Sequence, residues 1–170
     1  MICWYALHVR SQHEHLVSDQ LFYAGIEALY PHVVGRSKDG RRDVETKFFP
    51  GYVFGHFDID AKTPVMAIPQ IVSILGWGTH AVAIPDFEIA AVRLIVEAPV
   101  FVAVTPCPYV AEGDRVRVLR GPLRGLEGYV AYSKTATRVI VSVSMLARSI
   151  SVDVDTSYLH LIERRPMAAA

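Results

Sequence analysis

The segment 47–54, Lys-Phe-Phe-Pro-Gly-Tyr-Val-Phe, constrains the fold of this chain more than any other stretch. It holds four aromatic residues within seven positions, interrupted by a Pro-Gly pair. Successive residues of a β-strand point to opposite faces of a sheet, so Tyr52 and Phe54 would share one face. Two neighbouring rings on one face either belong to the core or form a surface on which a partner docks. The residue pattern alone leaves both interpretations open.

Alternating and helical patterns around this segment predict an α+β N-terminal domain, a mainly antiparallel sheet flanked by helices. Residues 4–9 read as a strand whose even-numbered and odd-numbered side chains face opposite sides. Ser11 and Glu14 have the spacing of a capping box, which predicts a helix that ends at Gly25. The other expected elements are strands at 26–30, at 52–57 and at 71–75, a hairpin of 32–34 with 43–47, and a helix over 85–96.

The remainder of the chain predicts a linker and a second, smaller domain. Three prolines punctuate residues 99–111, although this stretch is apolar enough that we expect part of it to pack on a domain. From Asp114 onward, short alternating strands separated by glycines predict a small all-β barrel. We therefore expect domains at 1–98 and 112–165, a linker at 99–111 and a tail at 166–170.

Composition narrows the classes of function. Lysine plus arginine and aspartate plus glutamate both number 17, so strong nonspecific binding to nucleic acid has no support. The sequence lacks a nucleotide-binding Gly-Lys-Ser/Thr motif and histidines at metal-ligand spacing, so we expect no enzyme, cofactor or metal site. Without a signal-peptide pattern or an apolar run of ~20 residues, a cytoplasmic monomer without membrane contact is expected.

Two sets of motifs resemble the NusG family of bacterial transcription elongation factors. Trp4-Tyr5-Ala6-Leu7 and Phe48-Phe49-Pro50-Gly51-Tyr52-Val53-Phe54 resemble its N-terminal domain. Gly113-Asp114-Arg115-Val116-Arg117-Val118, Gly121-Pro122-Leu123 and Gly125-Leu126-Glu127-Gly128 resemble its KOW domain, an SH3-like barrel of five strands. The resemblance extends over residues 3–163, and KOW after this N-terminal motif is more specific than either motif alone.

The resemblance implies a docking surface for RNA polymerase. The family's N-terminal domain binds the clamp helices of the largest polymerase subunit and suppresses pausing. The residues that match its polymerase-facing positions are Tyr5, His8, Phe49, Tyr52, Phe54 and Leu75. Within this set we expect Tyr52 and Phe54 to face the partner, Val53 to face the core, and the Pro-Gly pair to form the bend that presents them.

The resemblance also implies contacts for the loops of both domains. Arg10, Gln12 and His13 match the place where sequence-specific paralogs touch the non-template DNA strand, and a solvated helix end is the alternative. Met145, Leu146 and Arg148 align with the KOW loop that meets the termination factor Rho or a small-subunit ribosomal protein.

The polar loop 37–42, Ser-Lys-Asp-Gly-Arg-Arg, resembles loops of specialised, operon-selective paralogs. We therefore expect a specialised antitermination factor. The competing interpretation is a ribosome-associated KOW protein that binds RNA directly, and such a protein would not need the aromatic strand.

Overall fold

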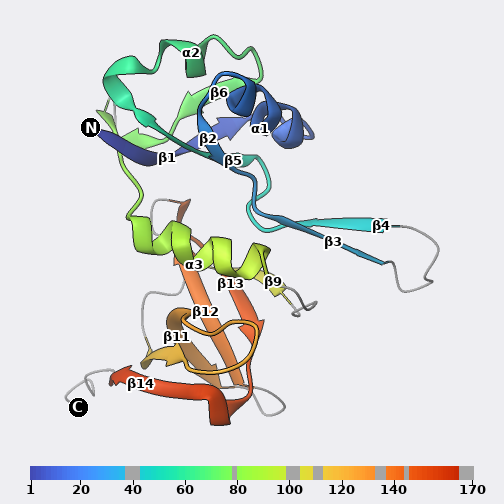
Figure 1. Cartoon of the computed structure of the whole chain (residues 1–170), viewed down its shortest axis with the longest axis vertical. Helices are drawn as coiled ribbons and strands as arrows, with labels where there is room; N and C mark the ends of the chain where they lie inside the picture. The colour runs from blue at the N-terminus through green and yellow to red at the C-terminus, as the bar shows by residue number, and fades with distance from the viewer. Residues whose placement is uncertain are drawn as a thin grey trace. The chain divides into compact units, whose positions relative to one another are not determined.

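The computed structural model describes residues 1–36, 43–77, 80–98, 104–108, 113–132, 137–143 and 146–164. The chain divides into two compact units, residues 1–89 and 90–170. The division falls inside one helix, α3 (Asp86–Val96). Each unit is built around its own antiparallel sheet (Figure 1).

A four-stranded sheet with strand order β2-β5-β1-β6 forms the centre of the N-terminal unit. Its strands are β1 (Ile2–Val9), β2 (Glu27–Leu29), β5 (Tyr52–Asp58) and β6 (Ile71–Ile74). Further elements are α1 (Glu14–Tyr23), β3 (His32–Arg36), β4 (Asp43–Lys47), the 3-10 turn Ile59–Ala61, α2 (Thr63–Met66), β7 (Gly76–Trp77) and β8 (His80–Ala81). The strands β3 and β4 pair with each other as a separate ribbon, which confirms the predicted hairpin.

The pairing of β1 with β5 sorts the side chains of this sheet onto two faces. The register runs from Ile2 opposite Asp58 to His8 opposite Tyr52. One face holds the main apolar core, which includes Tyr5, Leu7 and Val9 of β1, Val53 and Phe57 of β5, and Val17 and Leu21 of α1.

The opposite face of the same sheet carries aromatic side chains along its length. Trp4 on β1 stacks on His56 of β5, with ring centroids 4.7 Å apart and planes 11° apart. His56 also donates from Nδ1 to Glu27 Oε2 at 3.1 Å, which joins β2 to β5 on this face. The odd–even division predicted for residues 4–9 is confirmed by these two sets of contacts.

The start of α1 differs from the sequence prediction. The helix begins at Glu14, and His13 occupies the N-cap position without a side-chain capping bond. The predicted capping box of Ser11 and Glu14 is therefore wrong. Glu14 is buried and binds groups far away in the sequence, which a rule based on local spacing cannot anticipate.

The C-terminal unit contains a six-stranded antiparallel sheet of order β14-β10-β11-β12-β13-β9 among the described residues. Its strands are β9 (Val104–Pro108), β10 (Arg115–Val118), β11 (Glu127–Tyr132), β12 (Thr137–Val143), β13 (Arg148–Asp153) and β14 (Leu159–Glu163), and the 3-10 turn Thr156–Tyr158 precedes β14. The strand β9 lies within the expected linker and pairs with β13.

Buried β-branched side chains and cross-strand ion pairs hold this second sheet together. Val139, Val143, Ile150 and Val152 are fully buried, and within each strand they lie on one face of the sheet. Glu127 accepts hydrogen bonds from Arg115 and Arg117 of the neighbouring strand, and the bond from Arg117 lowers the pKa of its carboxyl group. Among the described residues, no helix is both long and apolar enough to cross a membrane.

Candidate functional site

His8 and Tyr52 form a partly exposed aromatic pair on the face of the N-terminal sheet that also carries Trp4 and His56. They lie opposite each other on β1 and β5, and their ring centroids are 5.5 Å apart. Leu75, which follows β6, donates its backbone N–H to the carbonyl of Ala6 at 2.8 Å and is also partly exposed. Ala6 and His8 alternate onto the same face. We call His8, Tyr52 and Leu75 the His8–Tyr52 surface.

Phe49 and Phe54 do not belong to an open surface. Their exposed fractions are 1% and 0%, and their rings pack edge to face with centroids 5.7 Å apart. Phe49 and Phe54 are therefore packed in the interior of this structure and not on an open face, and their contact with a partner stays a prediction. Phe54 does share a face with Tyr52, but alternation indicates only which face a side chain joins, not what covers that face.

Tyr5 and Val53 lie in the main core on the other side of the sheet. Tyr5 is 5% exposed and belongs to the same apolar cluster as Val53. The inward orientation predicted for Val53 is confirmed. Tyr5, in contrast, is separated by the sheet from the His8–Tyr52 surface, because it is an odd-numbered residue of β1.

A tight turn sets the position at which Tyr52 enters β5. The backbone N–H of Tyr52 donates to the carbonyl of Phe49 at 3.1 Å. Gly51 has a φ of +83°. A type II turn requires a positive φ at its third position, hence glycine, and often has proline at its second. The bend predicted for Pro50 and Gly51 is confirmed.

Arg10, Gln12 and His13 form an exposed connection between β1 and α1. The backbone of this connection is fixed: Arg10 N–H donates to the Gln70 carbonyl at 2.9 Å, and His13 N–H donates to the Arg10 carbonyl at 3.1 Å. Gln12 adopts a φ of +65°, in the left-handed region that a non-glycine residue seldom occupies. The three predicted DNA-contacting residues are thus brought together on one short, exposed loop.

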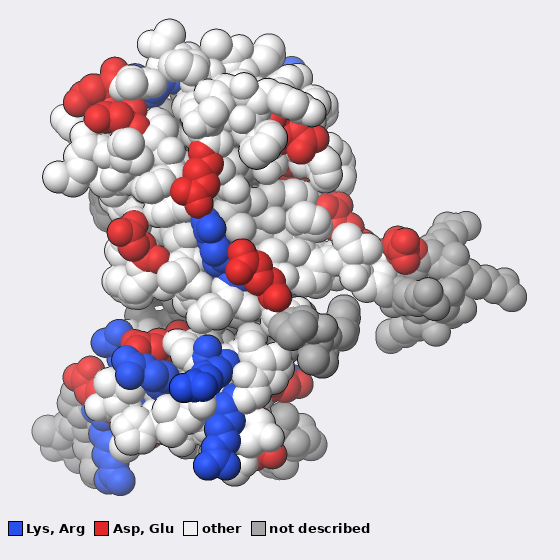
Figure 2. Space-filling view, in the orientation of Figure 1, with Lys and Arg blue, Asp and Glu red and all other residues white. Residues whose placement is uncertain are grey.

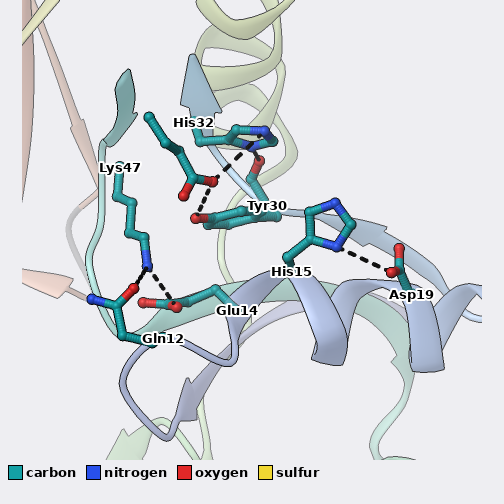
Figure 3. Close-up of polar contacts among 8 residues, drawn as sticks. Gln12, Glu14, His15, Asp19, Tyr30, His32 and Lys47 are labelled. Atoms are coloured by element: carbon teal, nitrogen blue, oxygen red, sulfur yellow. Dashed lines mark hydrogen bonds and ion pairs between the residues drawn. The ribbon is translucent and has the colours of Figure 1, made fainter. Parts of the chain in front are cut away.

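A buried carboxylate connects this loop to the aromatic segment (Figure 3). Lys47 Nζ donates to Gln12 Oε1 at 3.0 Å and to Glu14 Oε2 at 2.9 Å. The other oxygen of Glu14, Oε1, accepts from the backbone N–H of Gly51 at 3.0 Å. The Glu14 side chain is 2% exposed. We call Gln12, Glu14, Lys47 and Gly51 the Glu14 cluster.

A second polar cluster stabilises the base of the β3–β4 ribbon (Figure 3). Tyr30 donates its hydroxyl to Glu45 Oε1 at 2.7 Å, and its ring stacks on His32 at a centroid distance of 4.3 Å. Burial, reinforced by the Glu45 carboxylate, raises the pKa of Tyr30 well above its ordinary value. The phenol therefore stays protonated and remains a hydrogen-bond donor across the physiological range.

The partner-binding residues predicted on the second unit fall at the start of β13. Leu146 is partly exposed and Arg148 is exposed, and Arg148 pairs with Val143 of β12. Met145 lies outside the described residues. The visible face of the C-terminal unit carries a group of basic side chains, whereas that of the N-terminal unit is mainly uncharged (Figure 2).

Sequence reasoning missed the pairing of Glu14 with Lys47. The two residues are 33 positions apart, so no helical or strand spacing relates them. A charged lysine directly before an aromatic run, and a glutamate in the first turn of a helix, each have an ordinary solvated explanation. Only the fold brings the two charges together.

The Glu14 carboxylate makes the stability of the N-terminal unit depend on pH in the acidic range. Burial alone would raise its pKa, but hydrogen bonds from Lys47 and from the backbone N–H of Gly51 outweigh burial and lower it below the ordinary value of 4.5. A lowered pKa in the folded state adds stability above about pH 4.5, and this stability is lost as pH falls through the folded-state pKa. We expect the urea concentration at the unfolding midpoint to decrease as the pH is lowered below about 4.5. In Glu14→Gln this decrease should be less steep, because the titrating carboxylate is absent.

Urea titrations at a series of pH values measure this dependence. Asp19→Asn is the matched control, because Asp19 lies on the same helix with an exposed side chain paired to His15 at 3.0 Å. An acid dependence that is equally steep in the wild type and in Glu14→Gln would contradict the prediction.

Comparisons with known proteins identify the family. The family model described as "Transcription termination factor nusG" matches residues 2–93. A transcription termination/antitermination protein NusG from Deinococcus radiodurans is 27% identical, over 91% of this chain and 96% of that protein. The NusG of Thermus thermophilus is 30% identical, over 74% of this chain and 73% of that protein.

A solved structure agrees with this assignment at the level of the fold. The structure titled "Domain interaction in Thermotoga maritima NusG" matches with a TM-score of 0.55 at 22% identity, over 96% of this chain and 98% of that chain. The family model covers the aromatic strand, the Glu14 cluster and the His8–Tyr52 surface. The chain therefore belongs to the NusG family of transcription termination and antitermination factors.

Proposed function

We propose that this chain binds RNA polymerase through the His8–Tyr52 surface and modulates elongation as an antitermination factor in the cytoplasm. The occupant of this surface would be the pair of clamp helices of the largest polymerase subunit. The observation that carries the proposal is the aromatic pair of His8 and Tyr52, which is partly exposed on a sheet face whose Trp4 and Phe54 are buried. Aromatic anchors of this kind supply most of the energy in protein interfaces.

We infer that the loop of Arg10, Gln12 and His13 contacts the non-template DNA strand while the polymerase is bound. The three side chains are exposed, and the backbone that carries them is fixed by hydrogen bonds to Gln70 and within the loop. Zero net charge favours recruitment through the polymerase, because a neutral protein gains little from nonspecific attraction to DNA.

For the second unit we propose the SH3-like KOW barrel of the family, with a partner at Leu146 and Arg148. The antiparallel order β10-β11-β12-β13 and the buried valines of β12 and β13 support a small barrel. Rho or a small-subunit ribosomal protein would be its partner. We propose further that the chain is an operon-selective paralog, on the basis of its loop 37–42.

Binding of the full chain to core RNA polymerase and to free RNA tests the proposed function. We expect retention of core polymerase on the immobilised chain, with weak binding of RNA alone. Strong RNA binding without polymerase binding would favour a ribosome-associated protein and would overturn the proposal. Sequencing RNA from cells with and without the gene tests selectivity, because an operon-selective factor changes read-through in a few long operons only.

A further inference from the structure

We propose that Glu14 is a positioning residue, which holds the turn before Tyr52 and the Arg10–His13 loop in one rigid frame. A single buried carboxylate would thereby set the aromatic and the polar parts of the polymerase-binding face relative to each other. This inference rests on the proposed function of the His8–Tyr52 surface. It concerns a buried residue that is not part of the His8–Tyr52 surface.

The contacts of Glu14 reach both parts of this face. Glu14 Oε1 accepts from Gly51 N–H at 3.0 Å, one residue before Tyr52. Glu14 Oε2 accepts from Lys47, whose ammonium also donates to Gln12 in the loop. The Gly51 carbonyl in turn accepts from Val9 N–H at 2.9 Å, one residue after His8. The two aromatic residues and the loop are thus connected through one side chain.

Conformations in which Glu14 loses Lys47 or the Gly51 N–H are high in free energy. A carboxylate that is 2% exposed is tolerated only while its partners are in place, because a buried charge without a partner is strongly destabilising. Displacement of the turn would remove the Gly51 N–H, and displacement of Lys47 would remove the only positive charge that the described contacts place on this carboxylate. The turn and the loop therefore hold one geometry rather than a set of similar ones.

Stability alone does not require this pair. Well-packed apolar residues often replace a buried ion pair without loss of stability, so a charged pair is better explained by the directional geometry that its hydrogen bonds impose. The residues that these bonds orient are those proposed to bind the polymerase and DNA. Glu14 would act on affinity through the placement of Tyr52.

A double-mutant cycle of Glu14→Gln with Tyr52→Ala tests the proposal in full-length protein. Glutamine has nearly the same shape but lacks the charge that holds Lys47 and Gly51. We expect Glu14→Gln to weaken core polymerase binding about tenfold in the wild-type background. In the Tyr52→Ala background it should weaken binding much less, because the side chain that Glu14 positions is absent. Asp19→Asn, the same chemical change on the exposed side of the same helix, should bind like wild type.

Equal effects of Glu14→Gln in both backgrounds would mean that the two residues act independently, and would overturn the proposal. If Glu14→Gln folds poorly, Glu14→Gln combined with Lys47→Met removes both buried charges and allows the cycle to be repeated. If the folded variant with both Glu14→Gln and Lys47→Met binds polymerase with wild-type affinity, the proposal is likewise overturned.

Amide hydrogen exchange of Gly51 separates this inference from the proposed function. We expect the Gly51 amide to exchange faster in Glu14→Gln than in wild type, because its acceptor loses the charge. Unchanged exchange would overturn the positioning role even if the wild type binds polymerase. Faster exchange in Glu14→Gln, together with a wild-type protein that binds no polymerase, would support the rigid frame and refute only the proposed function.

Discussion

Replacement of Phe54 with alanine is expected to lower the free energy of unfolding of the N-terminal unit by about 3–5 kcal/mol, the range measured for buried phenylalanines. Phe54 is completely buried and packs edge to face against Phe49. Truncation removes this contact and leaves a cavity on the sheet face that also carries Trp4. A loss of this size approaches the whole stability of many domains.

Urea unfolding at neutral pH measures this effect, and Phe22→Ala is the matched control. Phe22 is 75% exposed at the end of α1, so its truncation should change the unfolding free energy by less than about 0.5 kcal/mol. A Phe54→Ala variant as stable as the wild type would show that the phenylalanine is not core.

Replacement of Tyr52 with alanine is expected to weaken binding to core RNA polymerase about 30-fold, which corresponds to an interface hot spot of about 2 kcal/mol. The ring of Tyr52 is partly exposed beside His8, so its removal takes away contact area for the partner and little of the core. Affinity measurements by surface plasmon resonance on full-length protein provide the readout.

Tyr23→Ala is the control for the chemical change, because Tyr23 is 85% exposed on α1 and is not part of the His8–Tyr52 surface. We expect it to bind polymerase like the wild type. Wild-type affinity in Tyr52→Ala, with its fold intact, would refute the polymerase-binding role of the His8–Tyr52 surface.

Local patterns in the sequence predicted much of the N-terminal fold. The alternation of residues 4–9 assigned Tyr5 and Leu7 to one face and Trp4 to the other, as the core and the Trp4–His56 stack confirm. The Pro-Gly pair predicted a bend, and a positive-φ Gly51 provides it. These features depend on backbone sterics and on a period of two residues, both of which are properties of short segments.

The candidate site was less predictable because its geometry depends on contacts distant in sequence. Alternation assigned Phe54 to the face of Tyr52, but whether that face is open depends on what packs over it, and Phe54 is covered. Glu14 fitted a capping box by spacing, whereas its real partners are Lys47 and Gly51. A buried charge can be recognised only after the fold has brought its partner to it.

The stacking of Trp4 on His56 gives the N-terminal unit an optical signature of its own. The chain has two tryptophans, Trp4 and Trp77, and both lie within residues 1–89. Intrinsic fluorescence excited at the tryptophan band thus follows the unfolding of the N-terminal unit, because residues 90–170 contain tyrosine but no tryptophan. If the two units unfold separately, the fluorescence transition is displaced from the transition seen by circular dichroism. A comparison of the two signals then assigns each substitution to the unit that it destabilises, and no label is needed.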